Sequence, residues 1–83
     1  MKDRVIVREF VQGLLRPKGD LEGFADSDSL IVTGRLDSVD TIELLEFLEQ
    51  RYRVDFAERG FDQNDLDSVD AIVAFLAAAL SPQ

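Results

Sequence analysis

Serines and carboxylates are the side chains of this 83-residue chain that could take part in chemistry, because it contains neither cysteine nor histidine. It therefore has no thiolate nucleophile, no sulfur-ligated zinc site and no imidazole to act as a general base. A serine nucleophile would need a lysine or carboxylate base, and no spacing suggests such a pair. The segment 26–28, Asp-Ser-Asp, begins like a calcium loop but lacks that pattern's glycine and terminal glutamate. The sequence thus predicts no catalytic residue, no metal site and no enzyme activity.

Two of the serines lie in the same local motif. The pentapeptide LDSVD at 36–40 recurs at 66–70, and the flanking residues do not match over a full repeat. Both copies are typical of helix starts, in which Asp or Ser caps the first turn and Val is the first core residue. Because the two pentapeptides are identical, any difference in role between Ser38 and Ser68 must come from the residues around them.

The overall charge excludes several classes of partner. Seventeen acidic residues against nine basic ones give a net charge of −8. Phosphate backbones and anionic membrane surfaces would meet a field of the same sign. No apolar run approaches the roughly 20 residues of a membrane span. The run Val5-Ile6-Val7 is too short to be expected as a signal-peptide core. We expect a single cytoplasmic, monomeric domain over residues 1–83 that binds neither nucleic acid nor membrane.

Three segments have the apolar spacing of amphipathic helices: residues 3–15, 38–53 and 68–80. The first helix should bury the stripe Ile6, Val7, Phe10, Val11 and Leu14 and expose Arg4, Arg8, Glu9 and Gln12. The last should bury Val69, Ile72, Val73, Leu76 and Leu80 behind a cap at Asp67 or Ser68. Between residues 54 and 66 the pattern is ambiguous, with Phe56 and Phe61 expected inside and a one-turn helix near 62–65. These elements predict an all-α, up-and-down four-helix bundle of three main helices and one short one.

A long loop, residues 17–36, follows the first helix. A loop of about 20 residues tends to be functional or held by its own side chains. We expect Leu21, Phe24, Leu30 and Ile31 to hold it, and Gly34 to provide a turn before the second helix.

The second helix has an unusual outer face. Asp37 or Ser38 should cap it, and Leu44, Leu45, Leu48 and Tyr52 should form its buried side, with Thr41 among them. Acids gather opposite, yet Val39 and Ile42 project among them, where a structural helix prefers polar residues. We expect partners to dock on this mixed face: Val39, Asp40, Ile42, Glu43, Glu46 and Glu49.

The segment TGRLDSVDTIEL, residues 33–44, closely resembles the phosphopantetheine-attachment motif of the acyl carrier protein family. That motif has an upstream glycine, Asp-Ser followed by Leu, Val or Met, and then a hydrophobic-Glu-Leu step. The continuation LEFLEQRY, residues 45–52, resembles the rest of the family's second helix. Length, acidity, the long loop and the closing helix extend the resemblance over nearly the whole chain.

The resemblance implies that Ser38 is a covalent attachment point. In the family, a phosphopantetheinyl transferase uses magnesium and coenzyme A to place a 4′-phosphopantetheine on that serine, and Asp37 matches the acid that helps to engage the transferase. The terminal thiol of the arm then carries an acyl group as a thioester. The implied partners are this transferase, an acyl- or aminoacyl-activating ligase and downstream acyl-transfer enzymes.

Three differences from the carriers of bacterial fatty-acid synthesis bear on the identity of the cargo. Val39 and Glu46 replace the usual leucine and methionine of bacterial fatty-acid carriers, Gly34-Arg35-Leu36 replaces Leu-Gly-Ala, and residues 57–67 lack the acidic, proline-containing stretch. The motif is more similar to specialised carriers that serve acyl- or aminoacyl-activating enzymes. Because Phe10, Phe47 and Tyr52 add bulk, we expect a short or polar cargo held outside the bundle. The alternative function is a small acidic helical adaptor that is never modified.

Overall fold

The computed structural model describes residues 2–80, which form four α-helices and no strand. These are α1 (Lys2–Leu15), α2 (Ser38–Tyr52), α3 (Phe56–Arg59) and α4 (Val69–Leu80), with 3₁₀ turns at Arg16–Lys18 and Gln63–Leu66. The all-α class, the three main helices and the long loop after the first are confirmed. The short helix expected near 62–65 is a 3₁₀ turn, and the short α-helix lies earlier, at α3. None of the described helices is both long enough and apolar enough to cross a membrane.

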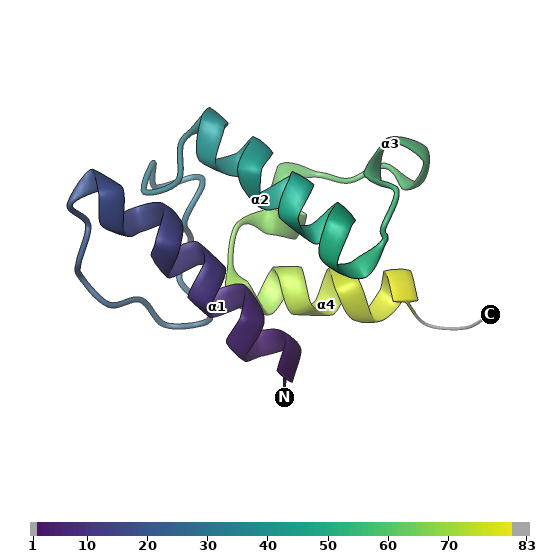
Figure 1. The fold of residues 1–83 in the computed structure, drawn as a ribbon, viewed down its shortest axis with the longest axis horizontal. Coiled ribbons are helices and arrows are strands. Elements are labelled where there is room, and N and C mark those ends of the chain that lie inside the picture. Colours follow the sequence, from purple (N-terminus) through teal and green to yellow (C-terminus); the bar gives the residue numbers. More distant parts are fainter. Residues whose placement is uncertain (1, 81–83) are drawn as a thin grey trace.

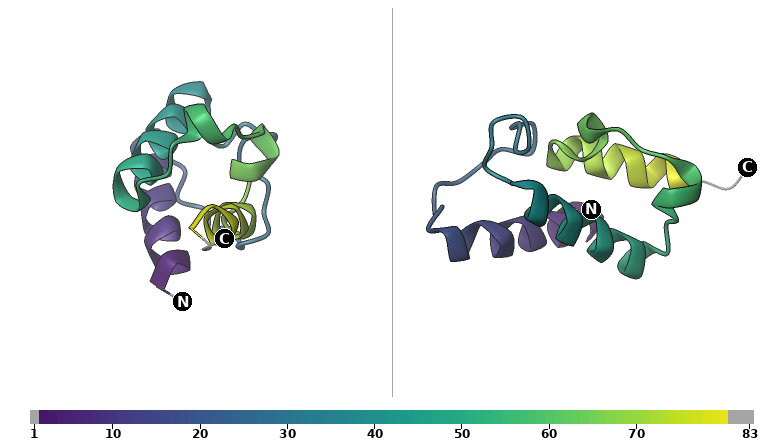
Figure 2. Two further views of the ribbon diagram at one scale, coloured as in Figure 1. Left: turned by 90° about the vertical axis from the view of Figure 1, so that its right-hand side faces the viewer. Right: turned by 90° about the horizontal axis from the view of Figure 1, so that it is seen from above.

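The three main helices do not alternate in direction. α1 runs opposite to α2, but α4 runs the same way as α2 (Figures 1 and 2). The reason is the segment between them, which passes through α3 and returns along the molecule to the 3₁₀ turn before α4 begins (Figure 1). The expected up-and-down order therefore holds only for α1 and α2.

One hydrophobic core joins the helices and the long loop. Each buried aliphatic side chain stabilises the fold by about 1.5–3 kcal/mol relative to an exposed one. The core residues whose side chains are at most 2% exposed are Val7, Val11, Leu15, Leu30, Leu36, Leu44, Leu48, Phe56, Leu66, Val69, Ile72 and Leu76. The loop thus contributes to the core through Leu30 and Leu36.

Most of the aromatic side chains lie at the edge of this core. Phe10 and Phe47 stack with ring centroids 4.0 Å apart, both only partly buried, and the Tyr52 hydroxyl donates to Asp3 Oδ1 at 3.2 Å. Phe61, which was expected inside, is 44% exposed because Phe56 takes the core position and Phe61 packs edge-on against it. Leu80, expected on the buried stripe of α4, is 48% exposed at the end of that helix.

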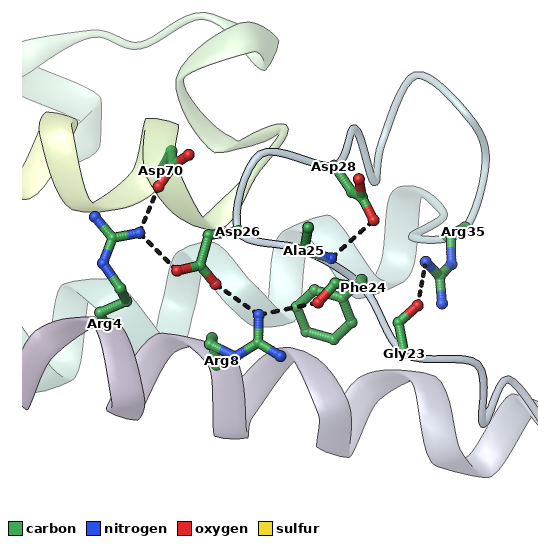
Figure 3. Close-up of polar contacts among 9 residues, drawn as sticks. All are labelled: Arg4, Arg8, Gly23, Phe24, Ala25, Asp26, Asp28, Arg35 and Asp70. Carbon is green, nitrogen blue, oxygen red and sulfur yellow. Dashed lines mark hydrogen bonds and ion pairs between the residues drawn. The ribbon is translucent and has the colours of Figure 1, made fainter.

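Ion pairs join α1 to the long loop and to α4. Arg4 contacts both Asp26 and Asp70, and Arg8 donates to Asp26 at 2.6 Å and to the Phe24 carbonyl at 3.1 Å (Figure 3). Arg4 and Arg8 were expected on a solvent face, but both are only half-exposed because they bridge these elements.

The loop side chains follow the sequence prediction with one exception. Phe24 and Leu30 are buried and Ile31 is partly buried, as expected, whereas Leu21 is 78% exposed. The neighbouring Asp20 anchors this part instead, through a two-pronged pair with Arg35 at 2.9 Å for each contact. Gly34 has φ +84°, which confirms the expected turn.

Candidate functional site

Ser38 is the first residue of α2, and its side chain is exposed. Asp37, immediately before it, is the cap: its Oδ1 accepts from the Asp40 N–H at 2.8 Å, and Asp40 Oδ2 accepts from the Asp37 N–H at 3.2 Å. This reciprocal capping box satisfies two helix-end amides without the serine. No side-chain hydrogen bond among the described residues 3–80 involves the Ser38 hydroxyl; those at this helix start belong to Asp37, Asp40 and Thr41.

Ser68 is placed differently, although its local sequence is the same. α4 begins one residue later relative to the motif, at Val69, and the Ser68 hydroxyl caps it by accepting from the Ala71 N–H at 3.0 Å. The preceding Asp67 is then free to anchor the long loop. Its carboxylate accepts from the Ser29 hydroxyl at 2.6 Å and from the backbone N–H groups of Ile31 and Val32 at 2.7 and 2.9 Å.

The two valines of the repeat differ accordingly. Val69 is fully buried, whereas Val39 is 64% exposed. The expectation that both copies are capped helix starts is confirmed, but Val39 is not a core residue. Only one copy of the motif leaves its serine hydroxyl free.

A lysine lies beside the start of α2. Lys18 Nζ donates to Asp40 Oδ2 and to the Arg35 carbonyl, both at 2.6 Å, and lies 3.8 Å from Asp37 Oδ2. The hydrogen bond to Asp40 raises the pKa of Lys18. The pKa of Asp37 is lowered, first by the Asp40 backbone N–H and then by the charge of Lys18. At neutral pH Lys18 is thus a cation and Asp37 an anion, and Lys18 offsets part of the negative charge around Ser38.

The proposed docking face is narrower than the sequence suggested. Asp40 is only 8% exposed, because the capping box and Lys18 hold its carboxylate against the bundle. Glu49 is half-buried. Val39 and Ile42 are 64% and 58% exposed, and Glu43 and Glu46 are also exposed. Of the six residues expected to dock partners, the exposed ones are therefore Val39, Ile42, Glu43 and Glu46. We call these four, with Ser38 at one end, the exposed face of α2.

An open groove of about 580 Å³ adjoins Ser38. Its apolar lining comes from the loop, from α2 and from the segment before the second 3₁₀ turn: Ile31, Leu36, Ile42 and Phe61. Phe61 and Lys18 were not expected at this site. Both come from parts of the chain remote from Ser38, and no local sequence pattern indicates such a long-range contact.

Comparisons with protein-family models, with curated proteins and with solved structures give no significant match to this chain.

Proposed function

We propose that this chain is a carrier protein that receives a 4′-phosphopantetheine arm on Ser38 and holds an acyl or aminoacyl intermediate on it as a thioester. The observation that carries the proposal is the free hydroxyl of Ser38 at an exposed helix start that Asp37 already caps. A serine that capped its own helix would lose that hydrogen bond on modification. Ser38 has no such bond to lose.

The residues around Ser38 fit a phosphodiester. A phosphate attached to Ser38 would lie at the N-terminus of a 15-residue helix, where the helix dipole favours an anion. Lys18 reduces the repulsion that Asp37 and Asp40 would otherwise exert. When bound, the arm would supply the thiol that a chain without cysteine lacks.

The surroundings also suit repeated transfer between enzymes. The exposed face of α2, with two apolar residues among acids, is typical of a transient interface that has a small dry centre and a charged rim. We propose that the phosphopantetheinyl transferase, an acyl- or aminoacyl-activating ligase and downstream acyl-transfer enzymes dock there. The open groove beside Ser38 offers a short cargo partial shelter outside the core.

The test is the intact mass of the chain after incubation with coenzyme A, magnesium and a broad-specificity phosphopantetheinyl transferase. We expect a gain of one phosphopantetheine for the wild type and for Ser68→Ala, and no gain for Ser38→Ala. Ser68→Ala is the matched control because it removes the serine of the second motif copy. A full gain in Ser38→Ala would overturn the assignment.

The second candidate function is an unmodified acidic adaptor, which the exposure of Val39 and Ile42 favours independently. The same assay separates the two functions. A wild-type chain that gains no mass while an unrelated carrier in the same tube is modified would support the adaptor and exclude the carrier.

A further inference from the structure

A second groove, of about 530 Å³, lies on the other side of α2, where that helix meets α1. Its floor contains the stacked Phe10–Phe47 pair, and its rim carries Glu9 from α1 and Glu43 and Glu46 from α2. Gly13 also lines the groove, and a side chain at this position would have space, because no atom lies within 4 Å of where its Cβ would be. We call this surface the Phe10–Phe47 groove.

Among the side chains that the structure describes, those of residues 3–80, every ion pair uses an aspartate, and none involves Glu9, Glu43 or Glu46. An apolar floor within an unpaired acidic rim complements a surface of the opposite charge. A second copy of this chain is a poor occupant, because it would bring another net charge of −8.

We propose that the Phe10–Phe47 groove binds a basic amphipathic helix of a partner protein, with an arginine against the aromatic pair and apolar side chains above Gly13. An arginine guanidinium can stack on an aromatic ring and still reach a carboxylate at the rim. Glu43 and Glu46 also belong to the exposed face of α2, so the groove continues that face toward α1. The inference does not depend on modification of Ser38 and applies to a carrier and to an adaptor alike.

The test uses the full chain carrying Ser38→Ala, so that modification cannot influence binding. The probe is a fluorescein-labelled helical peptide with leucines along one stripe and arginines flanking it, and anisotropy measures its affinity. Amide chemical-shift changes map where it binds. We expect the largest shifts around Phe10, Gly13 and Phe47, and weaker binding when the arginines are replaced by lysines.

Gly13→Leu should fill the groove and weaken binding by about tenfold, as expected for the centre of an interface. Ala74→Leu, on the exposed side of α4, is the matched control and should leave the affinity unchanged. Glu9→Gln and Glu46→Gln should each weaken binding about two- to fivefold at low salt, whereas Glu58→Gln on α3 should not. The melting temperature of each variant checks that the fold is retained.

Three results would overturn the proposal. The first is equal affinity for Gly13→Leu and Ala74→Leu, and the second is a set of shifts centred away from α1 and α2. The third is a concentration-dependent dimer of the chain that the peptide disrupts, because it would assign the groove to self-association. Loss of Ser38 modification would leave these results unaffected, so failure of the proposed function and failure of this inference are distinguishable.

Discussion

Ser38 and Ser68 are both preceded by aspartate and followed by valine, yet α2 begins at Ser38 and α4 begins at Val69. This shift of one residue decides which side chain caps each helix. Asp37 caps α2 and leaves the Ser38 hydroxyl free, whereas Ser68 caps α4 and leaves Asp67 to hold the loop. One pentapeptide therefore takes two roles, depending on the helix register around it.

Stability measurements on the two alanine variants should reflect these roles. Ser68→Ala removes the bond to the Ala71 N–H and should lower the free energy of unfolding by about 1 kcal/mol, as is typical of a lost cap. Ser38→Ala should change it by no more than about 0.5 kcal/mol, as is usual for surface substitutions. Urea denaturation of the two variants and of the wild type measures these free energies. Equal losses in both variants would mean that Ser38 also caps α2 in solution.

The position of Asp40 follows from the sequence. Asp40 lies four residues before the buried Leu44, and residues four apart share a helix face. The pattern therefore placed Asp40 beside the core, and its role in a capping box follows from its position three residues after Asp37. Lys18 could not be predicted, because its contact with Asp40 joins residues 22 apart in sequence.

Among the helices, α1 contains a glycine whose replacement should stabilise the fold. Gly13 lies inside the helix, is exposed, and has space for a Cβ. Gly13→Ala should raise the free energy of unfolding by about 0.5–1 kcal/mol, because alanine loses less backbone entropy in a helix. Gly34→Ala is the contrasting variant and should lower it by about 1 kcal/mol or more, since φ is +84° there. Thermal unfolding would show opposite shifts, and shifts of the same sign would contradict the assigned backbone conformations.

The exposed face of α2 should control encounter with the transferase. Glu43 is exposed and away from the core, so Glu43→Lys should leave the melting temperature nearly unchanged. It should slow modification of Ser38, mainly through the association rate, and added salt should reduce the difference. Initial rates at low and high salt provide the measurement, with Glu58→Lys on α3 as control. Equal rates for Glu43→Lys and wild type at low salt would leave Glu43 with a solubilising role alone.

Helix periodicity predicted α1, α2 and α4 to within one residue or so at each end, because each buries a stripe of regularly spaced apolar residues. The short α3 was missed because four residues are too few to establish a period. The direction of α4 depends on how residues 53–68 return along the molecule, and no local pattern encodes that path. Burial of Leu36 was missed for a similar reason, since its contacts come from the loop's fold.

The packing of the whole molecule bears on the cargo. We expected Phe10, Phe47 and Tyr52 to fill the interior of the bundle. They lie at its edge instead. The interior is occupied by closely packed aliphatic side chains with Phe56, and the apolar space next to Ser38 is an open groove. Lengthening an acyl chain on the modified protein should therefore leave the melting temperature nearly constant. A progressive rise with chain length would mean that the bundle opens to shelter the chain.

Acid should unfold the molecule by releasing the ion pairs that hold the long loop. Hydrogen bonds from Arg8 and Arg4 lower the pKa of Asp26 below its ordinary value of 3.8, and the hydrogen bond from Arg35 lowers that of Asp20. Burial raises the pKa of Asp67, but its bonds from Ser29, Val32 and Ile31 outweigh this effect and leave the pKa lowered. A carboxylate with a lowered pKa binds protons more tightly in the unfolded chain. Its stabilising contribution is therefore complete above the unfolded value and is lost as the pH falls through the folded one.

We expect the free energy of unfolding to stay level or rise slightly from about pH 7 to pH 5, where the repulsion of a net charge of −8 relaxes, and to fall below about pH 4. Asp26→Asn removes the carboxylate that Arg4 and Arg8 share, so it should be less stable than wild type at neutral pH. The difference should begin to shrink below about pH 4, because protonation of Asp26 in the unfolded wild-type chain then offsets the stabilising effect of the folded carboxylate. Urea denaturation across this pH range measures the free energy of unfolding of both proteins, with Glu58→Gln as control. A difference between Asp26→Asn and wild type that stays constant with pH would mean that its cause is packing and not the charge of Asp26.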